Sequence, residues 1–120
     1  MMKPSAQSGT QGDRGLSEAI DRLWVRFVPE IKERIAELHA AAEALTAGTL
    51  TASHRETAHA AAHKLAGVLG SFGLTRGTVL ARELEINFSR EDGPDRAKGK
   101  KLAAIAAELR KMVESRRSAG

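Results

Sequence analysis

One stretch of the chain, Ala58 to Leu74, limits the possible folds more than any other, because its side chains sort into two opposite faces of one helix. The stretch reads A-H-A-A-A-H-K-L-A-G-V-L-G-S-F-G-L. At about 100° per residue, its larger apolar residues fall on one face with the spacing of a core-packing stripe. That face comprises Ala58, Ala61, Ala62, Leu65, Leu69 and Phe72, with Val68 at its edge. The opposite face carries His63, with His59 at its flank.

The residues around His63 are unusually small for the exposed side of a helix. Ala60, Ala66, Gly67 and Gly70 border the predicted His63 face. A glycine inside a helix destabilises it by roughly 0.8–1 kcal/mol relative to alanine, and exposed positions usually carry Glu, Lys or Gln. A single exposed histidine most often has no role, but this clearing gives a bulky partner room to reach the imidazole. The pattern therefore favours a functional histidine at position 63.

The same segment resembles the signature of histidine-containing phosphotransfer (HPt) domains of bacterial phosphorelays. That family places a phosphorylatable histidine in mid-helix, a leucine two residues later, and glycines four and ten residues later. Here these positions are occupied by His63, Leu65, Gly67 and Gly73. The motif itself covers residues 62–73, and the helical pattern around it extends the resemblance to residues 29–116.

The resemblance implies that His63 carries a phosphoryl group as a phosphoramidate and exchanges it with an aspartate of a receiver domain. The implied partners are response-regulator receiver domains and a sensor histidine kinase of the hybrid type. The receiver would supply the acceptor Asp, Mg²⁺ and a Lys, so this chain would need no cofactor of its own. The chain contains no ATP-binding motif and no receiver-type acidic cluster, so we expect a phosphohistidine intermediate, not a kinase, with kinase and receiver on separate chains.

The cation that would balance the phosphoryl charge differs from the family pattern. The lysine that the family often has three residues after its histidine is Ala66 here, whereas Lys64 follows His63 directly. Lys64, with Lys101 or Arg82, is the candidate for this role, and an ordinary surface lysine is the alternative. We expect the following residues to form the phosphoryl-access and docking surface: Lys64, Ala66, Gly67, Gly70, His59 and Ala60.

The periodicity over the whole chain predicts an all-α fold. Four helices after Pro29, joined by short turns, should form an antiparallel up-and-down four-helix bundle, with Leu16–Val28 as an additional N-terminal helix. Pro29 should either separate these two helices or kink them. Gly48 and Gly73 are predicted to end helices in the left-handed conformation. We expect a flexible arm over residues 1–15, the domain over 16–116, and a basic tail over 117–120.

Composition excludes several classes of protein. The chain has no cysteine, so it has no disulfide framework and no thiolate metal site. No apolar run approaches the roughly 20 residues that span a bilayer, and the polar N-terminus lacks the apolar segment of a secretory signal. We therefore expect a soluble, cytoplasmic monomer that does not contact membranes. The net charge is +4 but its basic residues are dispersed among acids, which predicts no specific binding of nucleic acid.

Three alternatives remain at this stage. The first is a basic helical module that binds nucleic acid or scaffolds a partner, although no helix-turn-helix, zinc-finger or aromatic platform supports it. The second is a degenerate HPt-like dimerisation domain that does not use its histidine, against which the intact His63 and Gly67 argue. The third is a metal site on His59 and His63, spaced i,i+4; no third ligand stands at the expected spacing, so we expect no metal.

Overall fold

The computed structural model describes the backbone of residues 4–90 and 93–116, with side chains from residue 14 onward. Over these residues the chain is helical, with no strand. The elements in chain order are α1 (Pro4–Ala47), α2 (Ala52–Ser71), α3 (Thr75–Phe88), a 3₁₀ turn η1 (Arg96–Lys98) and α4 (Gly99–Ser115). The predicted all-α fold class is confirmed.

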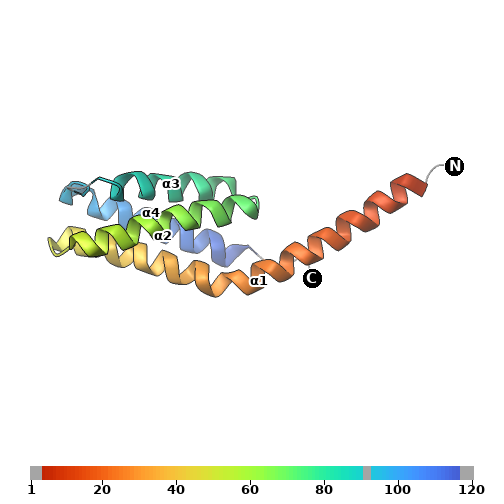
Figure 1. The fold of residues 1–120 in the computed structure, drawn as a ribbon, viewed down its shortest axis with the longest axis horizontal. Helices are drawn as coiled ribbons and strands as arrows, with labels where there is room; N and C mark the ends of the chain where they lie inside the picture. The colour runs from red at the N-terminus through yellow and green to blue at the C-terminus, as the bar shows by residue number, and fades with distance from the viewer. Residues whose placement is uncertain (1–3, 91–92, 117–120) are drawn as a thin grey trace.

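The four α-helices form one bundle in which each helix neighbours the next (Figure 1). The helix α1 packs against α2 and α4, and α3 packs against the same two helices from the other side. Consecutive helices run in opposite directions, which short connections require. This is the antiparallel up-and-down four-helix bundle that the sequence predicts.

The expected additional N-terminal helix is not a separate element. It is the first part of α1, which runs for 44 residues through Pro29. Proline removes a hydrogen-bond donor and crowds the preceding turn, so it usually ends or kinks a helix. Here Trp24 before it and Ile31 after it are both buried, at 3% and 1% exposure, so the same core holds both sides. Figure 1 shows α1 changing direction as it leaves the bundle, in agreement with the predicted kink.

The start of α1 also differs from the expectation. The helix begins at Pro4, upstream of the start predicted at Leu16. Proline is well suited to a first helical position because its missing N–H has no intrahelical partner there. The basic tail, residues 117–120, lies outside the described residues. The division into arm, domain and tail stays a prediction.

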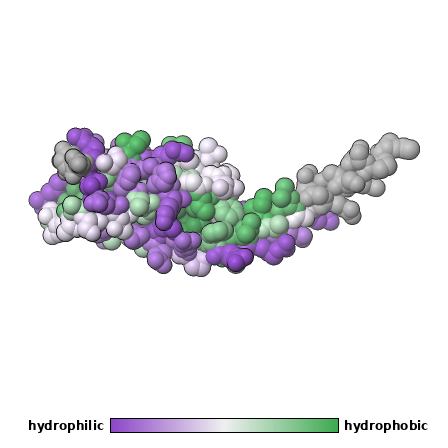
Figure 2. All heavy atoms as spheres, in the orientation of Figure 1, coloured by the Kyte–Doolittle hydropathy of each residue, from purple (hydrophilic) through white to green (hydrophobic). Residues whose placement is uncertain are grey.

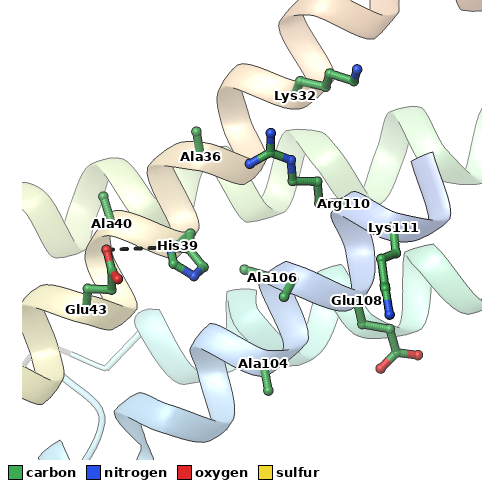
Figure 3. Close-up of a pocket in the computed structure, with 11 residues that line it drawn as sticks. Lys32, Ala36, His39, Ala40, Glu43, Ala104, Ala106, Glu108, Arg110 and Lys111 are labelled. Carbon is green, nitrogen blue, oxygen red and sulfur yellow. Dashed lines mark ion pairs between the residues drawn. The ribbon is translucent and has the colours of Figure 1, made fainter. Parts of the chain in front are cut away.

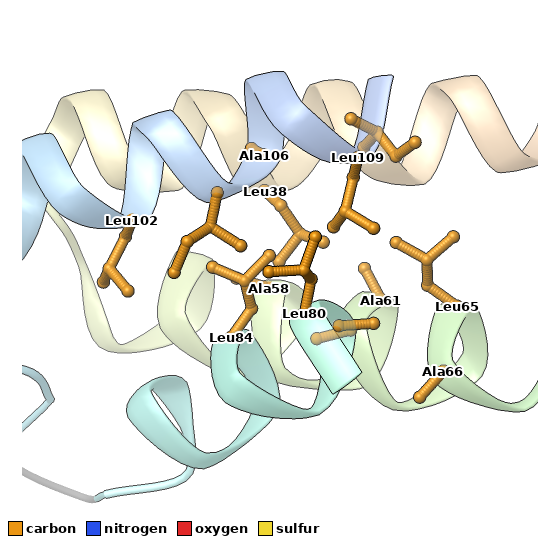
Figure 4. Packing of buried hydrophobic residues seen from close by; sticks show 14 of the residues in the cluster. Leu38, Ala58, Ala61, Leu65, Ala66, Leu80, Leu84, Leu102, Ala106 and Leu109 are labelled. Atoms are coloured by element: carbon orange, nitrogen blue, oxygen red, sulfur yellow. The ribbon is translucent and has the colours of Figure 1, made fainter. Parts of the chain in front are cut away.

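The core of the bundle consists entirely of apolar side chains among the described residues. The stripe predicted on α2 is buried, from Ala58 through Leu65 to Leu69, each 0% exposed. Figure 4 shows these side chains meeting residues of the other three helices. Those partners include Leu38, Leu80, Leu84, Leu102, Ala106 and Leu109. The burial of this face leaves the opposite face of α2 toward solvent.

Gly48 follows the end of α1, and Thr51 and Gly73 flank the two ends of α2. Gly48 and Gly73 have φ of +77° and +75°, the left-handed conformation predicted for both. The Thr51 hydroxyl accepts a hydrogen bond from the backbone N–H of His54 at 3.0 Å, which caps the helix start. Thus α2 has a fixed length and a fixed rotation against the core.

Aromatic contacts close the end of the bundle from which α1 projects. The Trp24 ring lies 5.1 Å from the Phe72 ring, edge to face. The Arg116 guanidinium lies 4.6 Å from the centre of the Trp24 ring and 3.5 Å from an Asp21 carboxylate oxygen. These contacts join α1 to the C-terminal ends of α2 and α4.

Candidate functional site

His63 lies in the middle of α2 and points away from the core. Its side chain is 72% exposed, as the helical pattern predicts. Ala60, Gly67 and Gly70 are exposed around it. A Cβ added at Gly67 would meet no heavy atom within 4 Å, whereas one added at Gly70 would lie 3.3 Å from the Thr78 hydroxyl. The clearing is therefore open at Gly67 and bounded by α3 at Gly70.

The structure places Ala66 differently from the expectation. Ala66 is 3% exposed, so it does not border the exposed face. Its carbonyl accepts a hydrogen bond of 3.3 Å from the Thr78 hydroxyl of α3. Ala66 is about 60° from His63 around the helix, on the side where α3 packs. Because α3 lies close enough to make this hydrogen bond, it covers the small side chain of Ala66.

The three candidate cations lie in different surroundings. Lys64 is exposed and lines a cavity of about 220 Å³ with Glu30 and Glu37, so it lies on the α1 side of the helix. Lys101 is paired with Glu83 at 3.3 Å. Arg82 is exposed on α3. Of the three, Lys64 is the one on the same helix as His63, and it faces the groove between α1 and α2.

The group that does meet His63 is a carboxylate that sequence reasoning missed. Glu85 of α3 places Oε2 2.7 Å from Nδ1 of His63 and 4.0 Å from Nε2 of His59. Helical spacing within α2 does not reveal this acid, because Glu85 lies on the neighbouring helix. The sequence does contain a signal for this contact. Because α2 and α3 form a hairpin about Gly73, His63, ten residues before it, and Glu85, twelve residues after it, lie at similar distances from the turn.

The contact with Glu85 favours one tautomer of the His63 ring. An ionised carboxylate accepts hydrogen bonds but donates none. The nitrogen that faces it, Nδ1, must therefore carry the hydrogen and donate it to Glu85. In a neutral imidazole the other nitrogen, Nε2, then holds the free lone pair. His63 is thus an exposed imidazole whose Nε2 atom, in this tautomer, is the ring nitrogen with a free lone pair.

Two further functional classes find no support in the described part of the chain. No group of three or more His, Cys, Asp or Glu residues there has an arrangement that could hold a metal ion. None of its helices is both long and apolar enough to cross a membrane.

A second cavity of the bundle lies away from His63. It has a volume of about 750 Å³ and lies between α1 and α4, where alanines leave a shallow space (Figure 3). Charged residues stand at its rim, including an ion pair of 3.5 Å between His39 and Glu43. His63 and Glu85 do not line this cavity, so it is separate from the candidate site.

A smaller cavity lies between α1 and α2, beside Lys64. It has a volume of about 190 Å³, and Lys64, Val68 and Phe27 are among its lining residues. Beyond it, α1 exposes Leu23 and Leu16, at 43% and 62%. Figure 2 shows apolar surface where α1 leaves the bundle. Apolar surface of this kind often marks a protein interaction site.

Comparisons with known proteins agree with this geometry. The model of the Hpt domain family matches residues 22–119. Over 66 residues the chain is 36% identical to protein RcaC of Microchaete diplosiphon, an alignment that covers 55% of this chain and 10% of the relative's length. No solved structure matched the chain significantly.

The family match includes α2 with its exposed histidine, the helix α3 that supplies Glu85, and α4. It covers most of the bundle and therefore does not rest on the short motif alone. It favours phosphotransfer over the alternative of a basic nucleic-acid-binding or scaffolding module. This chain belongs to the Hpt domain family, the histidine phosphotransfer domains of phosphorelays.

Proposed function

We propose that His63 is the phosphoryl acceptor of this domain and that its Nε2 atom forms the bond to phosphorus. The observation that carries the proposal is the 2.7 Å contact between Glu85 and Nδ1 of His63. This contact supports a protonated Nδ1 and a free lone pair on Nε2. The 72% exposure of the side chain and the open space at Gly67 support access by a protein partner.

The chemical step is an exchange of one phosphoryl bond for another. Nε2 of His63 attacks the phosphorus of an aspartyl phosphate on the partner, so that an N–P bond forms and the P–O bond to the Asp carboxylate breaks. The carboxylate leaves with the electron pair of that bond. The Nδ1 proton stays on the ring, where the charge of Glu85 stabilises the phosphorylated imidazolium. Transfer to another receiver is the same step in reverse.

The partners that fit this chemistry are receiver domains, with a hybrid sensor kinase upstream. The receiver would contribute the Asp, Mg²⁺ and a Lys, as membership of the Hpt family implies. We infer that the exchange takes place in the cytoplasm. In this role the domain carries the phosphoryl group between active sites that other domains provide.

The surface that we propose for receiver docking is centred on His63 and bordered by Ala60, Gly67 and Gly70. His59 lies on its α3 flank and Lys64 on its α1 flank. The apolar cavity at Phe27 and Val68 adjoins Lys64 and extends this surface toward the end of the bundle. Well-packed contacts of this kind set affinity, whereas charges at the rim mainly tune association.

A labelling experiment tests the acceptor. The domain is incubated with a receiver carrying ³²P-labelled aspartyl phosphate, and the label on the domain is measured. Wild type and His54→Gln, the control on the same helix, should take up label that is stable to base and labile to acid, as a phosphoramidate is. His63→Gln should take up none. Label that persists in His63→Gln would exclude the assignment.

A further inference from the structure

The structure places a second histidine at the same carboxylate, and the proposed chemistry has no role for it. We propose that His59 is a positioning residue that keeps Glu85 turned toward His63. The inference rests on the proposed function, because it concerns how the acceptor ring is held. It requires neither a metal nor a bound ligand.

The geometry places Glu85 between two imidazoles. One oxygen, Oε2, lies 2.7 Å from Nδ1 of His63 and 4.0 Å from Nε2 of His59. The two histidines are four residues apart on α2, so they lie on neighbouring turns of the same face. The Glu85 side chain is 20% exposed and the His59 side chain 39%. Among the described residues, the ion pairs of Glu85 are with these two histidines and with no lysine or arginine.

A single hydrogen bond holds a glutamate poorly. Glu85 has three rotatable side-chain bonds, so ordering it costs conformational entropy, and its partner His63 is largely exposed to water. His59 places an N–H group or, when protonated, a positive charge 4.0 Å from the same oxygen, beyond hydrogen-bond distance but close enough to attract it. Both the neutral and the protonated form of His59 attract the Glu85 carboxylate into the space between α2 and α3. His59 therefore favours the Glu85 conformation that fixes the His63 tautomer.

Three neighbouring cations, Lys101, Arg55 and Lys64, have partners elsewhere or lie on another surface. Glu83 on α3 is paired with Lys101 of α4. Arg55, one turn before His59 on α2, donates from its guanidinium to the Phe88 carbonyl at 2.7 Å. Lys64 lies on the α1 side of α2. None of Lys101, Arg55 and Lys64 therefore duplicates the attraction that His59 exerts on Glu85.

Two substitutions at position 59 separate a positioning role from a merely structural one. His59→Leu removes the donor and keeps a good helix former, whereas His59→Gln keeps an N–H donor on a neutral side chain. His54→Leu, in the first turns of the same helix, is the matched control. The first measurement is the tautomer of the His63 ring in the unphosphorylated protein, read from the ¹⁵N chemical shifts of its two nitrogens. The second is the rate of phosphoryl acceptance from a phosphorylated receiver.

We expect His59→Leu to lower the fraction of His63 with the proton on Nδ1 and to slow acceptance by about two- to fivefold, the range for a partly exposed charged contact. His59→Gln should restore most of both, and His54→Leu should change neither. An unchanged His63 tautomer in His59→Leu would overturn the inference, as would an equal loss in the Gln variant. The tautomer is measured without phosphotransfer, so this result does not depend on whether the proposed acceptor is correct.

Discussion

Replacing Gly67 by alanine and by arginine tests whether the clearing beside His63 is an access route for the partner. A Cβ at position 67 meets no heavy atom within 4 Å, so alanine introduces no clash. Alanine is favoured over glycine in a helix interior by about 0.8–1 kcal/mol. We therefore expect Gly67→Ala to raise the free energy of unfolding by nearly this amount, which is about 4–8 °C in Tm for a domain of 60–100 residues.

The matched control for stability is Gly70→Ala. A Cβ there would lie 3.3 Å from the Thr78 hydroxyl, which already donates to the Ala66 carbonyl. This contact is tighter than an ordinary van der Waals distance, so the gain in helix propensity is offset. Urea unfolding of both variants should show a clear gain for Gly67→Ala and little or none for Gly70→Ala. Equal changes in the two variants would refute the packing argument.

The functional half of the prediction uses Gly67→Arg. Arginine is a good helix former, so the fold and the helical content should be retained. Its long side chain should obstruct the approach to His63 and slow transfer from a phosphorylated receiver by about tenfold or more, a loss of about 1.4 kcal/mol. Ser53→Arg adds the same charge at an exposed position of α2, ten residues from His63, and should transfer normally. Normal transfer in Gly67→Arg would show that the clearing is not the access route.

Three further predictions concern the ring, the helix end and the partner. Glu85→Gln should weaken the preference for a protonated Nδ1 on His63 and slow transfer, because a neutral amide stabilises the charged ring less; an unchanged rate would remove Glu85 from the mechanism. Gly73→Ala should destabilise the bundle by about 1–2 kcal/mol in urea unfolding, since its φ of +75° disfavours a Cβ; no loss would contradict that conformation. Receiver transfer should weaken only modestly from low to physiological salt, whereas tight DNA binding at physiological salt without phosphotransfer would favour the nucleic-acid alternative.

The parts of the fold that depend on one helix at a time were predictable from the sequence. The buried stripe through Leu65 and Leu69 and the left-handed ends at Gly48 and Gly73 follow from local periodicity and from the conformational freedom of glycine. The continuity of α1 was less predictable. Local rules allow a break or a kink at Pro29, and the choice depends on core contacts on both sides of it.

The features of the site that depend on how two helices pack together were missed or misplaced by the prediction from sequence. Ala66 is buried because α3 approaches α2 closely, and a single helical projection contains no information about that distance. Glu85 reaches His63 only through the register of the α2–α3 hairpin. Helical spacing therefore identified the exposed histidine, whereas pairing the two helices about Gly73 was needed to find the group that orients it.

The most direct test of the account is the identity of the phosphorylated atom. The domain, labelled with ¹⁵N in its histidines, is phosphorylated by a receiver and observed by ³¹P and ¹⁵N NMR. The account predicts a single phosphorus–nitrogen bond, at Nε2 of His63, with a proton retained on Nδ1. A phosphoryl group on Nδ1 of His63, on His59, or on no histidine would contradict it.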